Sequence, residues 1–281
     1  MSRTIPRRPA GHPPVVLTIA GSDPSGGAGI QADLKTFAAL DAYGCAVLTA
    51  LTAQATTGVT GVHAVPAGFV REQVETLVAD VSIDAVKIGM LASADIVDEV
   101  HRLVVDVIDC PVVLDPVMIS TAGSRLLDAD AISSMTRLAP ACDLITPNLH
   151  ETAVLLGTDV ARDVDEQREQ AAALVAAGIP RALVKGGHGD GPEAIDVLVG
   201  PEGEQLLRGP RIATTATHGT GCTLSSAIAA LRPRHDGWLP AVREARGWLT
   251  EALRHGESLE IGAGAGPVHH FHELVRWRAT T

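Results

Sequence analysis

The 281-residue chain has the composition of a globular protein in water, with 46% hydrophobic and 20% charged residues. Its 33 acidic and 22 basic side chains give a formal net charge of −11, which repels nucleic acids and anionic membranes over most of the surface. One tyrosine, three phenylalanines and three tryptophans are too few for extensive base stacking. We therefore expect neither a nucleic acid nor a membrane as partner, and a phosphate-bearing partner must be held by a local site.

The N-terminal segment and the cysteines indicate where in the cell the protein is expected. Residues 1–14 carry arginines and prolines but no apolar segment before a cleavage site, which predicts a flexible leader. The four cysteines lack C-x-x-C spacing, as expected for reduced, mostly structural thiols. No apolar run reaches the length of about 18 residues that a membrane span needs. We expect a cytoplasmic protein in which residues 15–276 form one domain.

Apolar runs that suit buried strands alternate along the chain with helical patterns. The predicted strands are 15–20, 45–51, 85–88, 112–115, 144–146 and 182–185, with an extended segment at 59–65. The predicted helices are 30–40, 70–81, 95–107, 129–138, one from 148, 164–177, 220–231 and 238–255. Segments 194–199 and 204–207 have the spacing of a β-hairpin. This order predicts an α/β fold, a three-layer α/β/α sandwich whose mainly parallel central sheet has antiparallel strands at one edge.

Polar residues or glycines follow most of the predicted strands. They are Gly21 to Asp23, Gln54, Gly89-Met90, Asp115-Pro116, Pro147-Asn148 and Lys185-Gly186. In an open parallel sheet, ligands bind beyond the carboxyl ends of the strands. We therefore expect one shared site at this edge, with ordinary turn chemistry as the alternative.

The segment 217–222, Thr-His-Gly-Thr-Gly-Cys, leads directly into an apolar helix. Its two glycines allow a tight turn in which free N–H groups near Gly219 and Gly221 face one point, where the helix dipole also favours an anion. Cys222 would stand at the helix start, where its thiol pKa could be lowered for a part in proton transfer. The alternative is a glycine-rich helix cap with a small buried cysteine.

The glycine-rich loop at 21–29 is not a standard nucleotide motif. Residues 27–32 fit G-x-G-x-x-A, but the second strand lacks the acidic residue that holds a ribose. The Walker A spacing also fails, because Gly27-Ala28 stands where Lys-Ser/Thr is required. We expect a loop that covers a small polar substrate, with Asp33 and Gln54 offering groups for an amino-heterocycle. Taken singly, Asp33 could instead serve the helix dipole.

Asp115 ends an apolar strand, where a buried carboxylate needs a cation or another partner, and Mg²⁺ is the natural candidate. Glu151 follows Asn148 by three residues on the same helix face, which suits either a metal site or a capping box. Lys185 can extend over a phosphate from its strand end, although a solvated lysine is the usual alternative.

Two further site types are disfavoured. The spacing of His269, His270 and His272, beside Glu273, does not place all three rings on one helix face, so we expect a structural or surface role rather than a zinc site. No G-x-S-x-G elbow of a serine hydrolase is present.

Five motifs together closely resemble one enzyme family. They are TIAGSDPSGGAGIQADLKT at 18–36, KIGML at 87–91, TPN at 146–148, KGGH at 185–188 and HGTGC at 218–222. With GPVHHFH at 266–272, they resemble the hydroxymethylpyrimidine/phosphomethylpyrimidine kinases of thiamine biosynthesis over essentially all of 15–272.

The resemblance implies a ribokinase-like fold, usually a homodimer, and two successive phosphorylations that use ATP and Mg²⁺. The first acts on 4-amino-5-hydroxymethyl-2-methylpyrimidine and the second on its monophosphate. Motif matching implies a pyrimidine pocket lined by Gly21, Asp33, Gln54, Met90 and Val117. It implies nucleotide contacts from Asn148, Lys185, Thr217 and His218, and a magnesium side with Asp115 and Glu151. The catalytic set would be Gly219, Gly221, Cys222 and Lys185.

Two residues depart from related patterns. Many ribokinase-like sugar kinases have an aspartate base where this chain has Cys222, which could therefore orient the hydroxyl rather than remove its proton. Ala55 stands where the family commonly has asparagine, which bears on selectivity. Pyridoxal kinase stays open as an alternative, and so does a pyrimidine-sensing binding protein without turnover. Lys185 and Glu151 argue against the latter.

Overall fold

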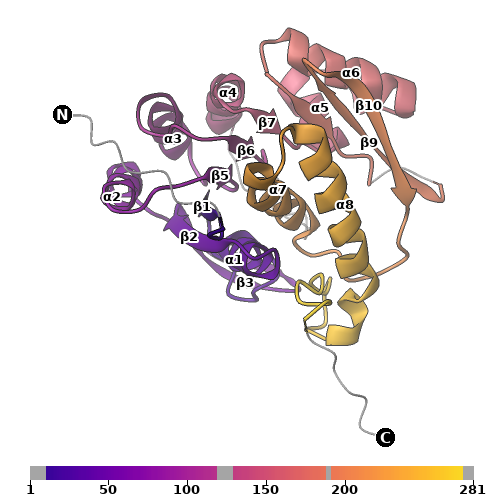
Figure 1. Cartoon of the computed structure of the whole chain (residues 1–281), viewed down its shortest axis with the longest axis horizontal. Coiled ribbons are helices and arrows are strands. Elements are labelled where there is room, and N and C mark those ends of the chain that lie inside the picture. Colours follow the sequence, from indigo (N-terminus) through magenta and orange to yellow (C-terminus); the bar gives the residue numbers. More distant parts are fainter. Residues whose placement is uncertain (1–10, 119–128, 188–190, 275–281) are drawn as a thin grey trace, which may run out of the picture.

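The computed structural model describes residues 11–118, 129–187 and 191–274 (Figure 1). Most of the predicted leader, residues 1–10, and His188 of the KGGH motif lie outside these described residues. Within the described part of the chain, no helix is both long and apolar enough to cross a membrane.

A central sheet of eight strands runs through the described residues, in the order β10-β9-β8-β7-β6-β5-β1-β2. The strands are β1 (Val15–Ala20), β2 (Tyr43–Leu48), β5 (Ala85–Ile88), β6 (Val112–Leu114), β7 (Leu144–Ile145), β8 (Ala182–Val184), β9 (Glu193–Gly200) and β10 (Gly203–Pro210). From β2 to β8 the neighbours pair in parallel, for example Ile19 with Ile88. The last two strands pair antiparallel, which confirms the predicted hairpin edge.

Helices cover both faces of the sheet, as Figure 1 shows. On one face lie α1 (Gly29–Ala39), α7 (Thr220–Leu231) and α8 (Trp238–Arg254), and on the other lie α2 (Ala67–Val78), α3 (Ala94–Asp106), α4 (Ala129–Leu138), α5 (Leu149–Leu156) and α6 (Val164–Ala176). Short 3₁₀ turns occupy Ala139–Ala141, Arg232–Arg234 and Gly256–Leu259.

The core lies in two layers because the parallel strands are buried on both faces. In β1, Leu17 packs into the core beneath α2 to α6, whereas Val16 packs into the core beneath α1, α7 and α8. The predicted three-layer α/β/α fold is confirmed.

One predicted strand is wrong. Segment 45–51 is not one strand, because the chain leaves the central sheet at Thr49 and enters a separate hairpin of β3 (Ala50–Ala55) and β4 (Gly58–Ala64). Thr49 fixes the exit: its N–H donates to the Ala20 carbonyl at 3.0 Å and its hydroxyl to the Met90 carbonyl at 2.7 Å. The continuous apolar pattern of this segment concealed a break that polar contacts with other strands impose.

Candidate functional site

The loops that follow the parallel strands and the start of α7 meet at one edge of the sheet. Asp115 follows β6, Asn148 follows β7 and Lys185 follows β8, and Asn148 and Lys185 form an isolated parallel bridge. An atom added as Cβ at Gly221 would lie 3.2 Å from the Lys185 Nζ and 3.3 Å from Asp115 Oδ2. The residues predicted from strand ends and from the 217–222 segment are therefore brought together.

The start of α7 has the backbone geometry of an anion-binding turn. Gly219 adopts φ +76°, and a Cβ there would lie 1.8 Å from the Gly27 carbonyl oxygen, so this position requires glycine. No side chain caps the helix that begins at Thr220. The Thr220 N–H donates to the Thr217 carbonyl at 3.3 Å, so the N–H groups of Gly221 and Cys222 are the ones that can donate to an anion.

A lysine and an aspartate form an ion pair beside this turn. Lys185 Nζ lies 3.0 Å from Asp115 Oδ1, and the side chains are 14% and 2% exposed. The hydroxyls of Thr146 and Ser225 lie 3.4 Å and 3.5 Å from the carboxylate oxygens of Asp115. Burial alone would lower the pKa of Lys185, but the charges of Asp115 and Glu151 outweigh it and raise that pKa.

Asn148 and Glu151 form the capping box that was the alternative to a metal site. The Glu151 N–H donates to the Asn148 side-chain oxygen at 2.9 Å, and the Asn148 N–H donates to Glu151 Oε2 at 2.8 Å. Burial raises the pKa of the Glu151 carboxyl to about 7, against the opposing effect of Lys185.

The two carboxylates of Asp115 and Glu151 fit a magnesium ion that arrives with phosphates. Mg²⁺ keeps several waters and binds through one or two carboxylates plus substrate phosphates. Among the described residues, no group of three His, Cys, Asp or Glu side chains could hold a metal.

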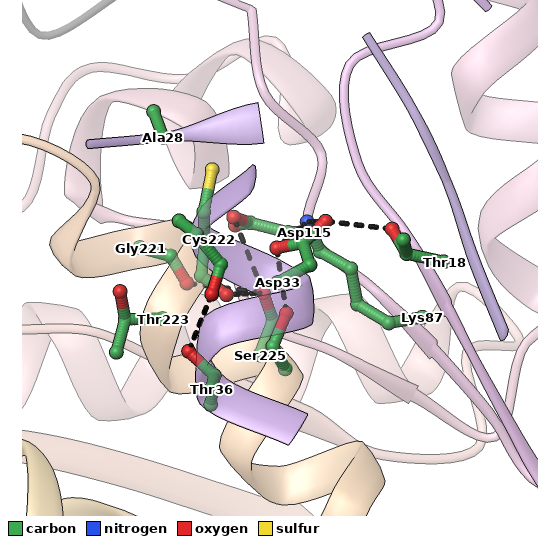
Figure 2. Close-up of polar contacts among 12 residues, drawn as sticks. Thr18, Ala28, Asp33, Thr36, Lys87, Asp115, Gly221, Cys222, Thr223 and Ser225 are labelled. Atoms are coloured by element: carbon green, nitrogen blue, oxygen red, sulfur yellow. Dashed lines mark hydrogen bonds and ion pairs between the residues drawn. The ribbon is translucent and has the colours of Figure 1, made fainter. Parts of the chain in front are cut away.

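Cys222 lies at the start of α7, with its sulfur on the side that faces Ala28 (Figure 2). The pKa of its thiol is not lowered, as the sequence led us to expect, but raised to about 11. Burial is the main cause, and it outweighs the Lys87 ammonium and the Gly29 N–H, which both favour the thiolate. The helix start alone does not decide the protonation state, because burial has the larger effect on the thiol.

Asp33 lies in a fully buried polar cluster beneath the site (Figure 2). Both of its carboxylate oxygens lie 2.9 Å from Lys87 Nζ, and the two side chains are 0% exposed. The Thr18 hydroxyl donates at 2.6 Å and the Ser226 hydroxyl at 2.7 Å. These contacts point away from a simple substrate ligand, and the predicted contact between Asp33 and the pyrimidine stays a prediction.

Lys87 is the polar residue of this cluster that sequence reasoning missed. Burial alone would lower the pKa of its ammonium, but Asp33, with smaller effects from Cys222 and Asp115, raises it. A signal was present, because a lysine between Val86 and Ile88 in a strand buried on both faces must have a charged partner.

The other predicted pyrimidine residues lie after β1, after β5 and in the hairpin strand β3. The Gly21 N–H donates to the Met90 carbonyl at 3.2 Å, so these two residues are adjacent. Gln54 Oε1 accepts from the Thr52 hydroxyl at 3.2 Å, and Thr52 donates in turn to the Ser22 carbonyl at 2.9 Å.

Val117 follows β6, at the same edge of the sheet, and is half-buried; its N–H donates to the Asp115 carbonyl at 2.8 Å. The hairpin β3–β4 and the turn after β6 thus contribute the remaining predicted residues of the pocket.

The two residues of segment 217–222 that were predicted to contact the nucleotide, Thr217 and His218, differ in burial. Thr217 is exposed, and its carbonyl accepts the Thr220 hydroxyl at 2.7 Å. His218 is buried, with Nε2 placed 2.8 Å from Asp23 Oδ2 in the glycine-rich loop. Its ring therefore faces another loop of the protein.

The C-terminal histidines serve packing. His269 and His270 are buried, and His270 Nε2 lies 3.1 Å from the Thr223 hydroxyl in the first turn of α7. Burial lowers the pKa of the His270 imidazole to about 3, so this ring is neutral. This placement agrees with the structural role predicted for the motif.

The chain was compared with known proteins. The phosphomethylpyrimidine kinase family model matches residues 23–269. A hydroxymethylpyrimidine/phosphomethylpyrimidine kinase of Escherichia coli strain K12 is 53% identical over 257 residues, which cover 91% of this chain and 97% of that relative.

Two solved kinase structures are similar to the chain over most of its length. The crystal structure of a phosphomethylpyrimidine kinase from Clostridium difficile is 39% identical, covers 85% of this chain and 99% of its own, and has a TM-score of 0.76. The pyridoxal kinase of Staphylococcus aureus in complex with ADP is 30% identical, covers 94% and 96%, and has a TM-score of 0.85. The chain belongs to the phosphomethylpyrimidine kinase family and has its ribokinase-like fold.

Proposed function

We propose that this chain transfers the γ-phosphoryl group of ATP to the hydroxymethyl group of 4-amino-5-hydroxymethyl-2-methylpyrimidine, and then a second one to the resulting monophosphate, in thiamine biosynthesis. The observation that carries the proposal is the meeting of the α7 start with Lys185 and Asp115, where a Cβ at Gly221 would lie 3.2 Å from the ammonium nitrogen. Phosphoryl transfer depends mainly on positioning and charge neutralisation, and this arrangement offers both.

The residues of the site divide into a phosphate side and a pyrimidine side. On the phosphate side, Lys185 binds phosphate oxygens, and the N–H groups between Gly219 and Cys222 hold the group in transfer. Mg²⁺ near Asp115 and Glu151 would neutralise the phosphate charge. Asn148 orients Glu151 through the capping box and helps to form the nucleotide side.

On the pyrimidine side, Gly21 and Met90 lie together, and Gln54 offers both a donor and an acceptor to the amino-heterocycle. Cys222 enters as a neutral thiol, because burial raises its pKa to about 11. It therefore orients the hydroxyl, whose proton passes to an oxygen of the transferred phosphoryl group as the new oxygen–phosphorus bond forms and the bond to the ADP leaving group breaks.

Pyridoxal is a second candidate substrate. The overall structure of the Staphylococcus aureus pyridoxal kinase superposes with a higher TM-score, 0.85, than that of the Clostridium difficile enzyme, 0.76. The sequence comparison favours the pyrimidine, since the Escherichia coli relative is 53% identical. A comparison of kcat/KM for the two alcohols in one preparation separates these candidates.

Release of ADP in the presence of ATP, Mg²⁺ and the pyrimidine alcohol tests the proposal. We expect turnover of both the alcohol and its monophosphate, and loss of at least about 100-fold in kcat/KM for Lys185→Met, on the scale of removing one transition-state contact. The control is Arg208→Met, which removes a cation from an exposed ion pair with Glu193. Failure to turn over either pyrimidine would refute the proposal, and tight binding without ADP release would favour the sensing protein.

Residues 15–276 would act as one kinase domain and pair with a second copy. The β3–β4 hairpin supports a homodimer, because Leu51 is 49% and Val62 is 50% exposed there. The four cysteines, all within the described residues, form no disulfide, and reduced thiols are usual in the cytoplasm, where ATP is also available.

A further inference from the structure

Two loops of the site are joined by one buried contact between Asp23 and His218. Asp23 belongs to the glycine-rich loop after β1, and His218 belongs to the turn before α7, almost two hundred residues later. Asp23 Oδ2 lies 2.8 Å from His218 Nε2, and the side chains are 1% and 8% exposed. Such a pair is screened little by solvent and fixes its two loops relative to each other.

The Asp23 carboxylate also organises its own loop. It accepts the Ala28 N–H at 2.8 Å, the Ser25 N–H at 2.9 Å and the Ser25 hydroxyl at 2.9 Å. Burial opposes its ionisation, but the hydrogen bonds, first that with His218, lower its pKa to about 2. The carboxylate is therefore charged at neutral pH and saturated with donors from both loops.

His218 is held equally firmly on its own side. Its N–H donates to the Gly266 carbonyl at 2.9 Å, and it forms an isolated parallel bridge with Pro267. The ring packs so closely on the other loop that a Cβ at Gly27 would lie 2.3 Å from His218 Cδ2. A larger residue at Gly27 would therefore collide with the ring and displace it.

The contact ends directly beside the groups that would handle the phosphoryl group. Ala28, which Asp23 holds, precedes Gly29, whose N–H contacts the Cys222 thiol. His218 precedes Gly219, which begins the anion-binding turn and lies against the Gly27 carbonyl. A shift of one loop would therefore move the thiol and the turn N–H groups relative to the bound alcohol.

We propose that Asp23 and His218 are positioning residues for phosphoryl transfer, whose contact locks the pyrimidine-side loop to the phosphate-side turn. This inference rests on the proposed kinase function. It assigns to His218 a role other than the nucleotide contact expected from the sequence. A displacement of the reacting groups by about 1 Å can reduce the rate of the chemical step about 100-fold. We therefore expect loss of the Asp23–His218 contact to lower mainly kcat.

Three variants test the contact in the full-length protein. His218→Leu removes the imidazole, and Asp23→Asn removes the carboxylate charge and one of the two acceptor oxygens that the donors of both loops share, whereas His218→Gln keeps an N–H donor near the position of Nε2. The control is Val100→Ala, which removes volume from the fully buried Val100 in α3, on the other face of the sheet. ADP release is measured with ATP and the pyrimidine varied separately, at a temperature at least 10 °C below the lowest melting temperature of the set.

We expect kcat to fall about 10- to 100-fold in His218→Leu and Asp23→Asn, with KM for ATP changed less than about threefold. His218→Gln should recover most of the loss, and Val100→Ala should keep the wild-type kcat despite a lower melting temperature. A rise in KM for ATP at constant kcat would assign His218 to nucleotide binding and overturn the proposal. So would a His218→Gln variant as slow as His218→Leu, or wild-type kcat in both disrupted variants. Absence of turnover in the wild type would instead refute the kinase function itself.

Discussion

The pKa of the Cys222 thiol can be measured, and its value shows whether the helix dipole, which lowers it, or burial, which raises it, has the larger effect. Burial raises the pKa of its thiol from the ordinary 9.0 to about 11. At pH 8 the thiolate fraction is then about 0.1%, against about 10% for a thiol with the ordinary value. Because the thiolate is the nucleophile, alkylation at pH 8 should be about 100-fold slower than for a free thiol of ordinary pKa, before any effect of access.

Alkylation by iodoacetamide between pH 7 and pH 11.5, followed by peptide mass spectrometry, measures this value in the unliganded protein. The midpoint of the rate profile, rather than the absolute rate, reports the pKa, since restricted access scales all rates alike. We expect a midpoint near 11 for the Cys222 peptide. Lys87→Met should move the midpoint higher, because the Lys87 ammonium favours the thiolate. Cys222→Ser identifies the peptide. A midpoint at or below 9 would show that the helix start outweighs burial and would make Cys222 available as a base.

Three further outcomes are expected from single substitutions. Cys222→Ala should lower kcat about tenfold or more and leave pyrimidine binding little changed. Steady-state kinetics measures kcat and calorimetry measures binding. An unchanged kcat would show that Cys222 takes no part in the chemical step. Lys87→Met should lower the free energy of unfolding in urea by about 3 to 5 kcal/mol, because it leaves the Asp33 carboxylate buried without its cation. The double variant Lys87→Met/Asp33→Leu should recover part of that loss, and additive losses would contradict the argument. Gly219→Ala should abolish measurable ADP release, because the added Cβ would lie 1.8 Å from the Gly27 oxygen, and retained turnover would show that the turn can rearrange.

Much of the fold followed from local sequence patterns. The bounds of β1, β5, α4 and α7 agree with the predicted segments, since each is an apolar run or periodic pattern that ends at a clear polar or glycine boundary. The strand-end rule also predicted that Asp115 and Lys185 would meet, because parallel strands bring their carboxyl ends to one edge. These inferences need only the local pattern and the topology of the sheet.

What could not be predicted depends on which distant side chains meet. The partner of Asp33 is Lys87, 54 positions away, and no local pattern distinguishes that pairing from a first-turn dipole role. The direction of the pKa shift of Cys222 was wrong because burial of the thiol and the carboxylates of Asp33 and Asp115 raise the pKa, and the sequence does not show how deeply the thiol is buried. The β3–β4 hairpin was missed because Thr49 leaves the sheet through contacts with Ala20, at the end of β1, and with Met90, in the loop after β5.

The two lysine–aspartate pairs can play different parts in the site, because they differ in how far their side chains are exposed. Lys87 and Asp33 are both 0% exposed and their polar atoms are bound to neighbouring side chains, so this pair can act on the site only as a fixed charge distribution. Lys185 is 14% exposed and contacts Asp115 at the edge of the sheet, so its ammonium can exchange a carboxylate for a phosphate oxygen. In the proposed kinase, a cation that neutralised Asp115 would weaken the attraction that holds Lys185 and would free the lysine to bind the nucleotide. The same residue types thus form a rigid support in the core and a mobile contact at the surface of the site.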